Sequence, residues 1–289
     1  FALSGSSARK IRKRGENLLA GRARVTNMFP FTSSEIEFDI DIERTLSYGM
    51  LPSVFNVEDP KDYLRSYVET YLQQEIKAEA LTRNLGGFVR FLEIAARQNG
   101  QVTNVSNIAR DAQVARQTVQ GYFEILVDTL VGFWLPAWKL KRATKQIAHS
   151  KFYFFDPGVC RSMSNRAPYP LQPEEMGHLF ETYILHEVRS YLHYTGKHYP
   201  IYFWSSPDGV EVDLFLETQK GYFAVEMKSG KLWYSRFNRG LKRIQEEYQL
   251  KTDQLLGIYY GEKDLTVDGI TVLTIQNFLQ RLWEDSLII

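Results

Sequence analysis

The sequence predicts a mixed α/β protein, and three observations support this fold class. Apolar side chains recur at helical spacing between residues 59 and 98, and two shorter helical patterns joined by a tight connection follow at 101–135. After residue 175, one long helical pattern precedes several runs of strand length. The chain has 289 residues, 44% of them hydrophobic, which is enough to fill more than one core.

The first 50 residues are expected to belong to a larger unit. Phe1 lies in an apolar triplet before SGSS, a pattern typical of a strand end, and residues 7–19 predict a basic helix. Thr32, Ser33 and Ser34 are predicted to cap a following helix. These pieces cannot close a core alone, so the chain is expected to be cut from a longer protein.

The middle of the chain predicts helices followed by a winged helix. Apolar positions predict a helix-turn-helix with helices at 105–111 and 115–127, in which Ile108, Val119 and Phe123 are buried. The aromatic runs WLPAWKLKR and KFYFFDPG predict the two strands of a wing. The prolines of YPLQPEEM indicate a domain boundary before a long helix at 176–194, and the later strands predict a mixed sheet.

Amino-acid composition indicates the cellular compartment but does not distinguish between classes of function. The single cysteine, Cys160, excludes an internal disulfide and fits the cytoplasm. No apolar run reaches the roughly 18 residues of a spanning helix, so no membrane partner is expected. The net charge of +1 favours no class of partner.

Residues 209–230, GVEVDLFLETQKGYFAVEMKSG, predict two strands joined by a tight turn. Strict alternation places Asp213 on one face of its strand, and Val212 and Leu214 on the other. A turn at 219–220 would set Asp213 opposite Glu226, and a turn at 220–221 would set it opposite Lys228. The alternative is an ordinary surface hairpin with an ion pair worth under about 1 kcal/mol.

Two carboxylates held this close need a compensating charge, which a divalent cation or Lys228 can supply. Mg²⁺ suits the site, because it binds through one or two carboxylates plus waters and substrate phosphate. On the preceding helix, Glu181 lies at the edge of the apolar stripe and Glu187 nearer its middle. An acid aimed from this helix toward the sheet would add a third ligand.

Basic side chains near these segments are candidates for binding the phosphates of nucleic acid. The wing contributes one group and the helix after the hairpin the other, and a solvated surface is the alternative for the helix. The candidates are Lys139, Lys141, Arg142, Lys145 and Lys151 in the wing, and Arg236, Arg239, Lys242 and Arg243 on the helix.

The spacing of the acidic residues resembles a known nuclease core. G-x-x-x-E from Gly177 to Glu181, Asp213 after Val212, and E-x-K from Glu226 to Lys228 are similar to the PD-(D/E)xK, or restriction-endonuclease-like, phosphodiesterases. The resemblance covers about residues 175–275, and Val212 stands where the motif has proline. It implies that Asp213 and Glu226 hold Mg²⁺, that Lys228 assists the nucleophile, and that Glu181 is the helix acid.

A wider resemblance covers nearly the whole chain. Segments including LLAGRA, RFLEIAARQNG, KFYFFDPGV, GHLFETYILHEV and VEMKSG are similar to prokaryotic AAA-type P-loop ATPases with a C-terminal domain of unknown function. It implies an ATPase-core edge at 1–50, a helical and winged-helix domain at 51–165, and a nuclease-like domain at 166–289.

The Walker motif G-x-x-x-x-G-K-[ST] is absent from the chain, so ATP is expected only in the complete protein. The resemblance implies that Ser4 faces the γ-phosphate and that Arg22 is a sensor or arginine finger; a structural cap or a surface charge is the alternative. The missing ATPase core becomes an expected partner, and oligomers are expected because such ATPases form rings.

Two functions remain open from the sequence. The first is Mg²⁺-dependent cleavage of phosphodiester bonds in nucleic acid. The second is a non-catalytic regulatory platform that binds nucleic acid or protein within an ATP-driven remodeller.

Overall fold

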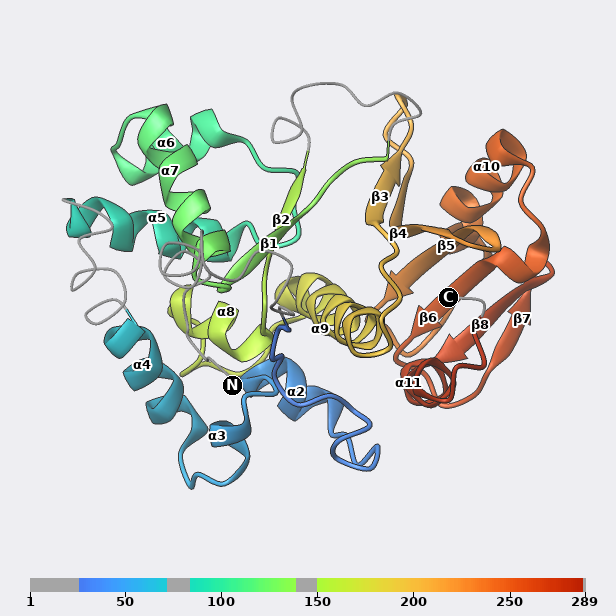
Figure 1. The fold of residues 1–289 in the computed structure, drawn as a ribbon, viewed down its shortest axis with the longest axis horizontal. Coiled ribbons are helices and arrows are strands. Elements are labelled where there is room, and N and C mark those ends of the chain that lie inside the picture. Colours follow the sequence, from blue (N-terminus) through green and yellow to red (C-terminus); the bar gives the residue numbers. More distant parts are fainter. Residues whose placement is uncertain (1–25, 72–83, 139–149, 288–289) are drawn as a thin grey trace, which may run out of the picture.

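A computed structural model describes residues 26–71, 84–138 and 150–287. In these residues a helical half and a sheet half lie on either side of one long helix, α9 (Pro173–Tyr194) (Figure 1). The helix predicted at 176–194 is therefore confirmed. The strand end expected at Phe1 and the basic helix expected at 7–19 lie outside the described residues.

The N-terminal part of the described chain is a turn followed by a short helix. Helix α2 (Ile42–Tyr48) is capped by Asp41, whose side chain accepts a hydrogen bond from the Arg44 amide at 3.0 Å. The prediction that Thr32 to Ser34 cap the next helix is wrong, because residues 33–38 form turns. Ser33 instead donates its amide and its hydroxyl to Glu187, at 2.8 and 3.0 Å.

The helical half contains the predicted helix-turn-helix. Ile108, Val119 and Phe123 are buried as expected, and Gln113 adopts a left-handed conformation (φ 56°) where the chain turns between the two helices. The helices of this half are α3 (Pro52–Phe55), α4 (Pro60–Thr70), α5 (Leu85–Arg97), α6 (Val105–Ala112), α7 (Arg116–Asp128) and α8 (Pro157–Met163).

Two antiparallel strands follow α7, in the order expected of a winged helix. They are β1 (Gly132–Leu135) and β2 (Lys151–Phe154), with Phe133 paired to Tyr153. All four residues of β2 are buried, so this strand does not project into solvent as the wing of a DNA-binding winged helix does. The chain beyond β1 also bonds to the large sheet, where the Trp138 amide donates to the Phe203 carbonyl at 2.7 Å.

The sheet half is a mixed sheet, as predicted, and it has six strands. Its strands are β3 (Ile201–Ser205), β4 (Glu211–Thr218), β5 (Gly221–Lys228), β6 (Leu255–Tyr259), β7 (Leu265–Val267) and β8 (Ile270–Thr274). The order is β3-β4-β5-β6-β8-β7. Strands β3, β4 and β5 pair antiparallel, β6 runs parallel to both β5 and β8, and β7 is an antiparallel edge.

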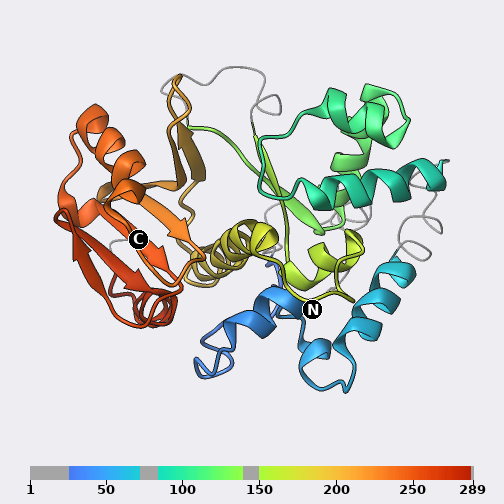
Figure 2. The same ribbon diagram turned by 180° about the vertical axis from the view of Figure 1, so that it is seen from behind.

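Helices cover both faces of this sheet. Leu214, Val225 and Met227 pack into one core that also contains side chains of α9 and α11 (Ile275–Trp283). Phe215 and Ala224 pack on the opposite face with α10 (Arg239–Tyr248). The first core extends without a break from α2 to α11, so the two halves are packed together, and α9 lies between them when the molecule is seen from behind (Figure 2).

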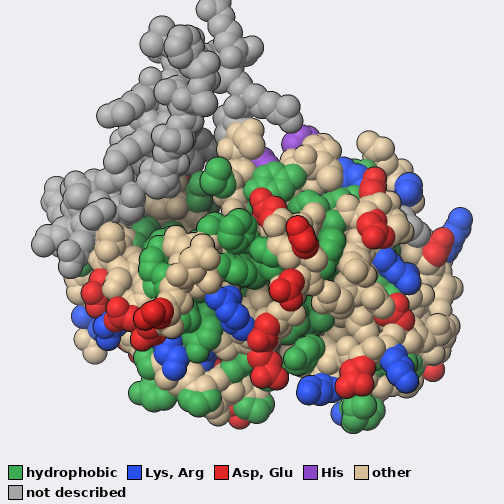
Figure 3. All heavy atoms as spheres, turned by 90° about the horizontal axis from the view of Figure 1, so that it is seen from below, with side chains coloured by type: hydrophobic (Ala, Val, Ile, Leu, Met, Phe, Trp, Pro, Cys, Tyr) green, Lys and Arg blue, Asp and Glu red, His purple; other side chains and the backbone are tan. Residues whose placement is uncertain are grey.

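The surface combines both signs of charge. On the face seen from below, acidic and basic side chains are interspersed among hydrophobic ones (Figure 3). In the described part of the chain, every helix is too short or too polar to cross a membrane.

Candidate functional site

The register of the hairpin brings the predicted acids together. Thr218 pairs with Gly221 and Leu214 with Val225, so Gln219 and Lys220 form the two-residue turn. This is the first of the two turns considered from the sequence. Continued by one step, the same register sets Asp213 opposite Glu226.

Strand β4 carries a β-bulge directly before this pair. Tyr202 of β3 pairs with Phe215, whereas Trp204 pairs with Val212, so β4 has one extra residue in between. Val212 consequently packs with Phe215 in the α10-side core, and the strict alternation predicted for this strand is wrong at Val212. The Asp213 carboxylate lies between the strands, and its Oδ2 accepts the Met227 amide at 2.8 Å.

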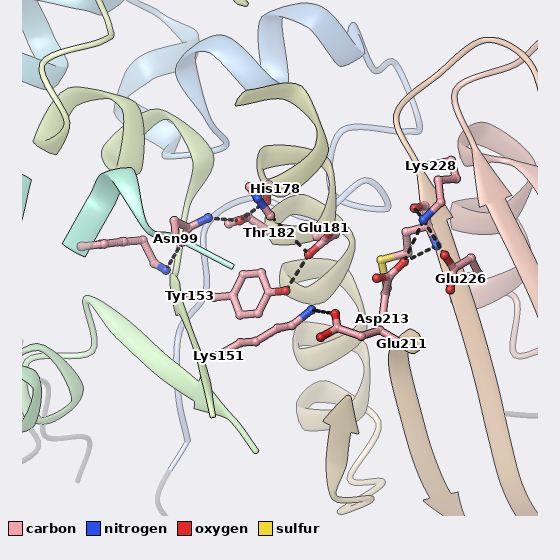
Figure 4. Close-up of polar contacts among 12 residues, drawn as sticks. Asn99, Lys151, Tyr153, His178, Glu181, Thr182, Glu211, Asp213, Glu226 and Lys228 are labelled. Carbon is pink, nitrogen blue, oxygen red and sulfur yellow. Dashed lines mark hydrogen bonds and ion pairs between the residues drawn. The ribbon is translucent and has the colours of Figure 1, made fainter. Parts of the chain in front are cut away.

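Asp213, Glu226 and Lys228 converge at this point (Figure 4). The Lys228 Nζ lies 2.5 Å from Glu226 Oε1 and 3.6 Å from Asp213 Oδ2. Both acids are nearly inaccessible, with 8% of Asp213 and 7% of Glu226 exposed. The interpretation as a solvated surface hairpin therefore does not describe this end of the strands.

The two acids hold more buried negative charge than one ammonium neutralises. Burial raises the pKa of Glu226 well above its ordinary value, the Asp213 charge adds to the rise, and Lys228 offsets part of it. Burial and the Glu181 charge likewise raise the pKa of Asp213. Glu226 Oε2 is buried and finds no hydrogen-bond donor within the described residues.

The same neighbours keep Lys228 charged. Burial alone lowers the pKa of an ammonium, but the charges of Asp213 and Glu226 outweigh it and raise the pKa of Lys228 above its ordinary value. Lys228 is therefore a fixed positive charge at neutral pH.

Glu181 belongs to a neighbouring cluster. Its Oε2 accepts a hydrogen bond from Tyr153 Oη at 2.7 Å and lies 3.9 Å from His178 Nδ1 (Figure 4). Burial raises its pKa, but His178, Lys151 and Tyr153 together outweigh burial and hold the pKa of Glu181 below its ordinary value. Glu181 is thus an ionised carboxylate anchored to strand β2.

Lys151 and Tyr153 are site residues that the sequence did not identify as such. Lys151 is 5% exposed and its Nζ lies 3.0 Å from Glu211, so its prediction as a phosphate contact of the wing is wrong. Burial lowers its pKa, but the charges of Glu181, Asp213 and Glu211 outweigh it and raise the pKa of Lys151. The signal was a lysine and a tyrosine two residues apart in KFYF, which places both on one face of an apolar strand.

Comparisons with known proteins show similarity to domains of unknown function. The family model of the domain of unknown function DUF8612 matches residues 39–169, and that of DUF4143 matches residues 176–278. DUF4143 domains are commonly found in proteins associated with AAA ATPases. No solved structure matches the chain.

Two curated proteins are also similar to the chain. The uncharacterized protein Rv2008c of Mycobacterium tuberculosis and the uncharacterized protein Mb2031c of Mycobacterium bovis are each 23% identical to it over 234 residues. The aligned part covers 79% of this chain and 52% of each relative. The chain thus spans about half the length of these relatives.

The remaining predicted residues do not join the site. Arg239 and Arg243 are exposed on α10, and Arg239 lies 3.8 Å from Asp208. Glu187 is fully buried and accepts hydrogen bonds from Ser33 and Trp283. The other predicted residues lie outside the described ranges: Ser4, Arg22, Lys139, Lys141, Arg142 and Lys145.

The donor set fits Mg²⁺ in one specific way. Across residues 26–71, 84–138 and 150–287, no group of three or more His, Cys, Asp or Glu side chains is placed to hold a metal ion. Mg²⁺ needs only one or two carboxylates when waters and substrate phosphate supply its other ligands. Asp213 and Glu226 offer such a pair, and the unpartnered Glu226 Oε2 is an oxygen that a cation would satisfy.

Proposed function

We propose that Asp213, Glu226 and Lys228 form a Mg²⁺-dependent phosphodiesterase site that acts on nucleic acid. The observation that supports it is the convergence of two buried acids and one ammonium just beyond the last paired residues of β4 and β5. Burying the Glu226 Oε2 atom without a hydrogen-bond partner destabilises its charged form. Burial raises the pKa values of both Asp213 and Glu226 for the same reason.

The roles of the side chains follow from their charges. Asp213 and Glu226 would hold the ion, which when bound supplies positive charge to the phosphoryl oxygens and acidifies water. The raised pKa of Lys228 makes it a hydrogen-bond donor and not a general base. It therefore stabilises negative charge that grows on the reacting phosphate.

Glu181 acts on this pair from a distance. Tyr153 holds its carboxylate at 2.7 Å, and its charge raises the pKa of Asp213. Its contribution in this proposal is to position and tune the site from α9, because its hydrogen bond already goes to β2.

A cleavage assay with isosteric variants tests the proposal. Wild type, Asp213→Asn and Glu226→Gln are incubated with linear, nicked and branched DNA and with RNA, in Mg²⁺ or Mn²⁺. Glu217→Gln is the matched control, because Glu217 is an exposed acid on the same strand as Asp213. The proposal expects cleavage by wild type and Glu217→Gln and its loss in the two site variants. Equal cleavage by Asp213→Asn would overturn it.

A second candidate function is a non-catalytic platform that serves the complete protein. The observation that favours it is the contact of Tyr153 with Glu181 and of Lys151 with Glu211, next to this cluster, with Lys151 and Tyr153 both at most 5% exposed. In that case the charged cluster holds the two halves together, and the activity is ATP-driven remodelling by the longer protein. Metal binding without cleavage of any substrate would support the platform.

A further inference from the structure

Cations and aromatic rings alternate from Lys228 to the surface beyond strand β5. The Lys228 Nζ lies 5.7 Å from the centre of the Phe237 ring, and Arg236 Cζ lies 5.3 Å from the same ring. Arg236 also lies 4.7 Å from the Tyr234 ring, and the rings of Tyr234 and Phe237 meet edge to face at 5.5 Å. These separations lie within the range of attraction between a cation and a ring.

Residues 231–237 are anchored to the sheet by one buried side chain and expose others at the surface. Trp233 is 8% exposed, donates its Nε1 hydrogen to Asn238 at 3.0 Å, and lies against Gly257 of strand β6. Tyr234 in contrast is 45% exposed and Leu232 is 64% exposed. The fold therefore holds an aromatic side chain at the surface on a fixed base.

Exposed basic side chains lie on the segment that carries Tyr234 and on α10, which follows it. They are Lys231, Arg236, Arg239, Lys242 and Arg243. Asp268 links the two groups, because it accepts hydrogen bonds from both Ser235 and Lys242. Arg239 lies 3.8 Å from Asp208, and Lys242 lies 2.7 Å from Asp268. The charge of Arg243 also lowers the pKa of Asp208. Lys231, Arg236 and Arg243 form no ion pair within the described part of the chain, so positive charge remains for an anionic partner.

We infer that residues 231–237 and the basic side chains of α10 form a binding platform for single-stranded nucleic acid. Cations recognise phosphates in any nucleic acid, but an exposed ring stacks only on a base whose face is free. Duplex bases stack on one another, so a duplex gains the phosphate contacts alone. The inference rests on the proposed function for the class of partner and adds that the strand reaching Lys228 is unpaired.

Fluorescence anisotropy with a labelled single-stranded oligonucleotide in EDTA tests this inference, because no cleavage occurs without metal. Tyr234→Ala should weaken binding roughly 5- to 100-fold, the range expected from one lost stacking contact, and Tyr234→Phe should retain it. Tyr169→Ala is the matched control, because Tyr169 is 58% exposed and Arg166 lies 5.7 Å from its ring. Binding of the corresponding duplex should change less than twofold, and thermal melting should confirm that each variant folds.

Several results would overturn the inference. They are wild-type binding by Tyr234→Ala, an equal loss for single strand and duplex, and an equal loss in Tyr169→Ala. Absence of any single-strand binding by the wild type would overturn it as well. Cleavage in Mg²⁺ together with normal binding by Tyr234→Ala defeats the inference and leaves the phosphodiesterase proposal standing. Single-strand binding that depends on Tyr234, without any cleavage, supports the inference and contradicts the phosphodiesterase proposal.

Discussion

Tyr153 on strand β2 donates a hydrogen bond of 2.7 Å to Glu181 on helix α9. Together with the ion pair of Lys151 and Glu211 at 3.0 Å, it connects strand β2 of the helical half to α9 and to strand β4 of the sheet half. The charged residues that surround the candidate site therefore come from both halves of the chain. Lys151 and Tyr153, which affect the pKa values of its acids, lie before α9 and outside residues 175–275.

Replacing Tyr153 by Phe should lower stability in a pH-dependent way. Loss of a hydrogen bond to a buried charged group costs about 1 to 3 kcal/mol. The folded-state pKa of Glu181 is depressed, so its contribution is present above the ordinary pKa of Glu and is lost as pH falls through the folded value. Denaturant unfolding should therefore show a larger loss at pH 7 than at acid pH. Tyr169→Phe, an exposed tyrosine, is the control, and a loss independent of pH would contradict this account.

Glu187 should make the protein less stable as pH rises toward neutrality. Burial raises its pKa to about 7, despite hydrogen bonds from Trp283 and Ser33. A raised folded-state pKa gives stability that is present below the ordinary pKa of Glu and is lost as pH rises through the folded value. A pKa shift of this size corresponds to a loss of about 3 kcal/mol in the free energy of unfolding between acid pH, below the ordinary pKa of Glu, and pH above the folded-state pKa.

The Glu187→Gln variant should lose this part of the pH dependence. Unfolding free energies measured between about pH 4.5 and pH 7 should decline less in the variant than in the wild type. Glu174→Gln, an exposed acid on the same helix, should follow the wild type. Parallel curves for wild type and Glu187→Gln would show that Glu187 does not titrate in this window.

A pair of glycine variants tests how closely α10 packs on the sheet. A Cβ on Gly240 would lie 2.1 Å from the Glu211 carbonyl oxygen, so Gly240→Ala must push α10 away from β4. We expect a destabilisation of about 1 to 3 kcal/mol, typical of overpacking. Gly121→Ala, where no atom lies within 4 Å, should stabilise α7 by about 0.5 to 1 kcal/mol. Equal effects in chemical unfolding would contradict the packing of α10.

Periodicity predicted the parts of the fold that have a local cause. The helical spacing of Ile108, Val119 and Phe123 identified α6 and α7, and the alternation in 209–230 together with its short turn identified β4 and β5. The convergence of Asp213 with Glu226 followed from the same pleat. These features depend on residues that are close in sequence, so the spacing of apolar residues can predict them.

The features that the sequence did not predict depend on distant contacts. The bulge at Val212 arises where β4 pairs with β3, and the sequence around Val212 contains no residue that predicts the extra residue in β4. Ser33 satisfies Glu187, 154 residues away, and so does not cap a helix. Two other missed elements have local causes. Strand β7 has only three residues and pairs with the next strand, β8. Helix α8 begins at Pro157, with Asp156 as its cap, inside what was expected to be the end of a strand.

Binding of Mg²⁺ should strengthen as pH rises. Asp213 and Glu226 have raised pKa values, so each holds a proton to a higher pH than usual and must lose it to bind a cation. Calorimetric titrations in buffers of different ionisation enthalpy should report proton release on binding. Glu226→Gln should release fewer protons, and affinity that is independent of pH would contradict the raised pKa values.

A titration with Mn²⁺ followed by electron paramagnetic resonance tests the central claim most directly, since it asks whether the pair holds a divalent cation. The wild type should show saturable binding that weakens roughly 10-fold or more in Asp213→Asn and in Glu226→Gln, but not in Glu217→Gln. Binding that is equal in the wild type and the two site variants, or absent from all of them, would contradict the account.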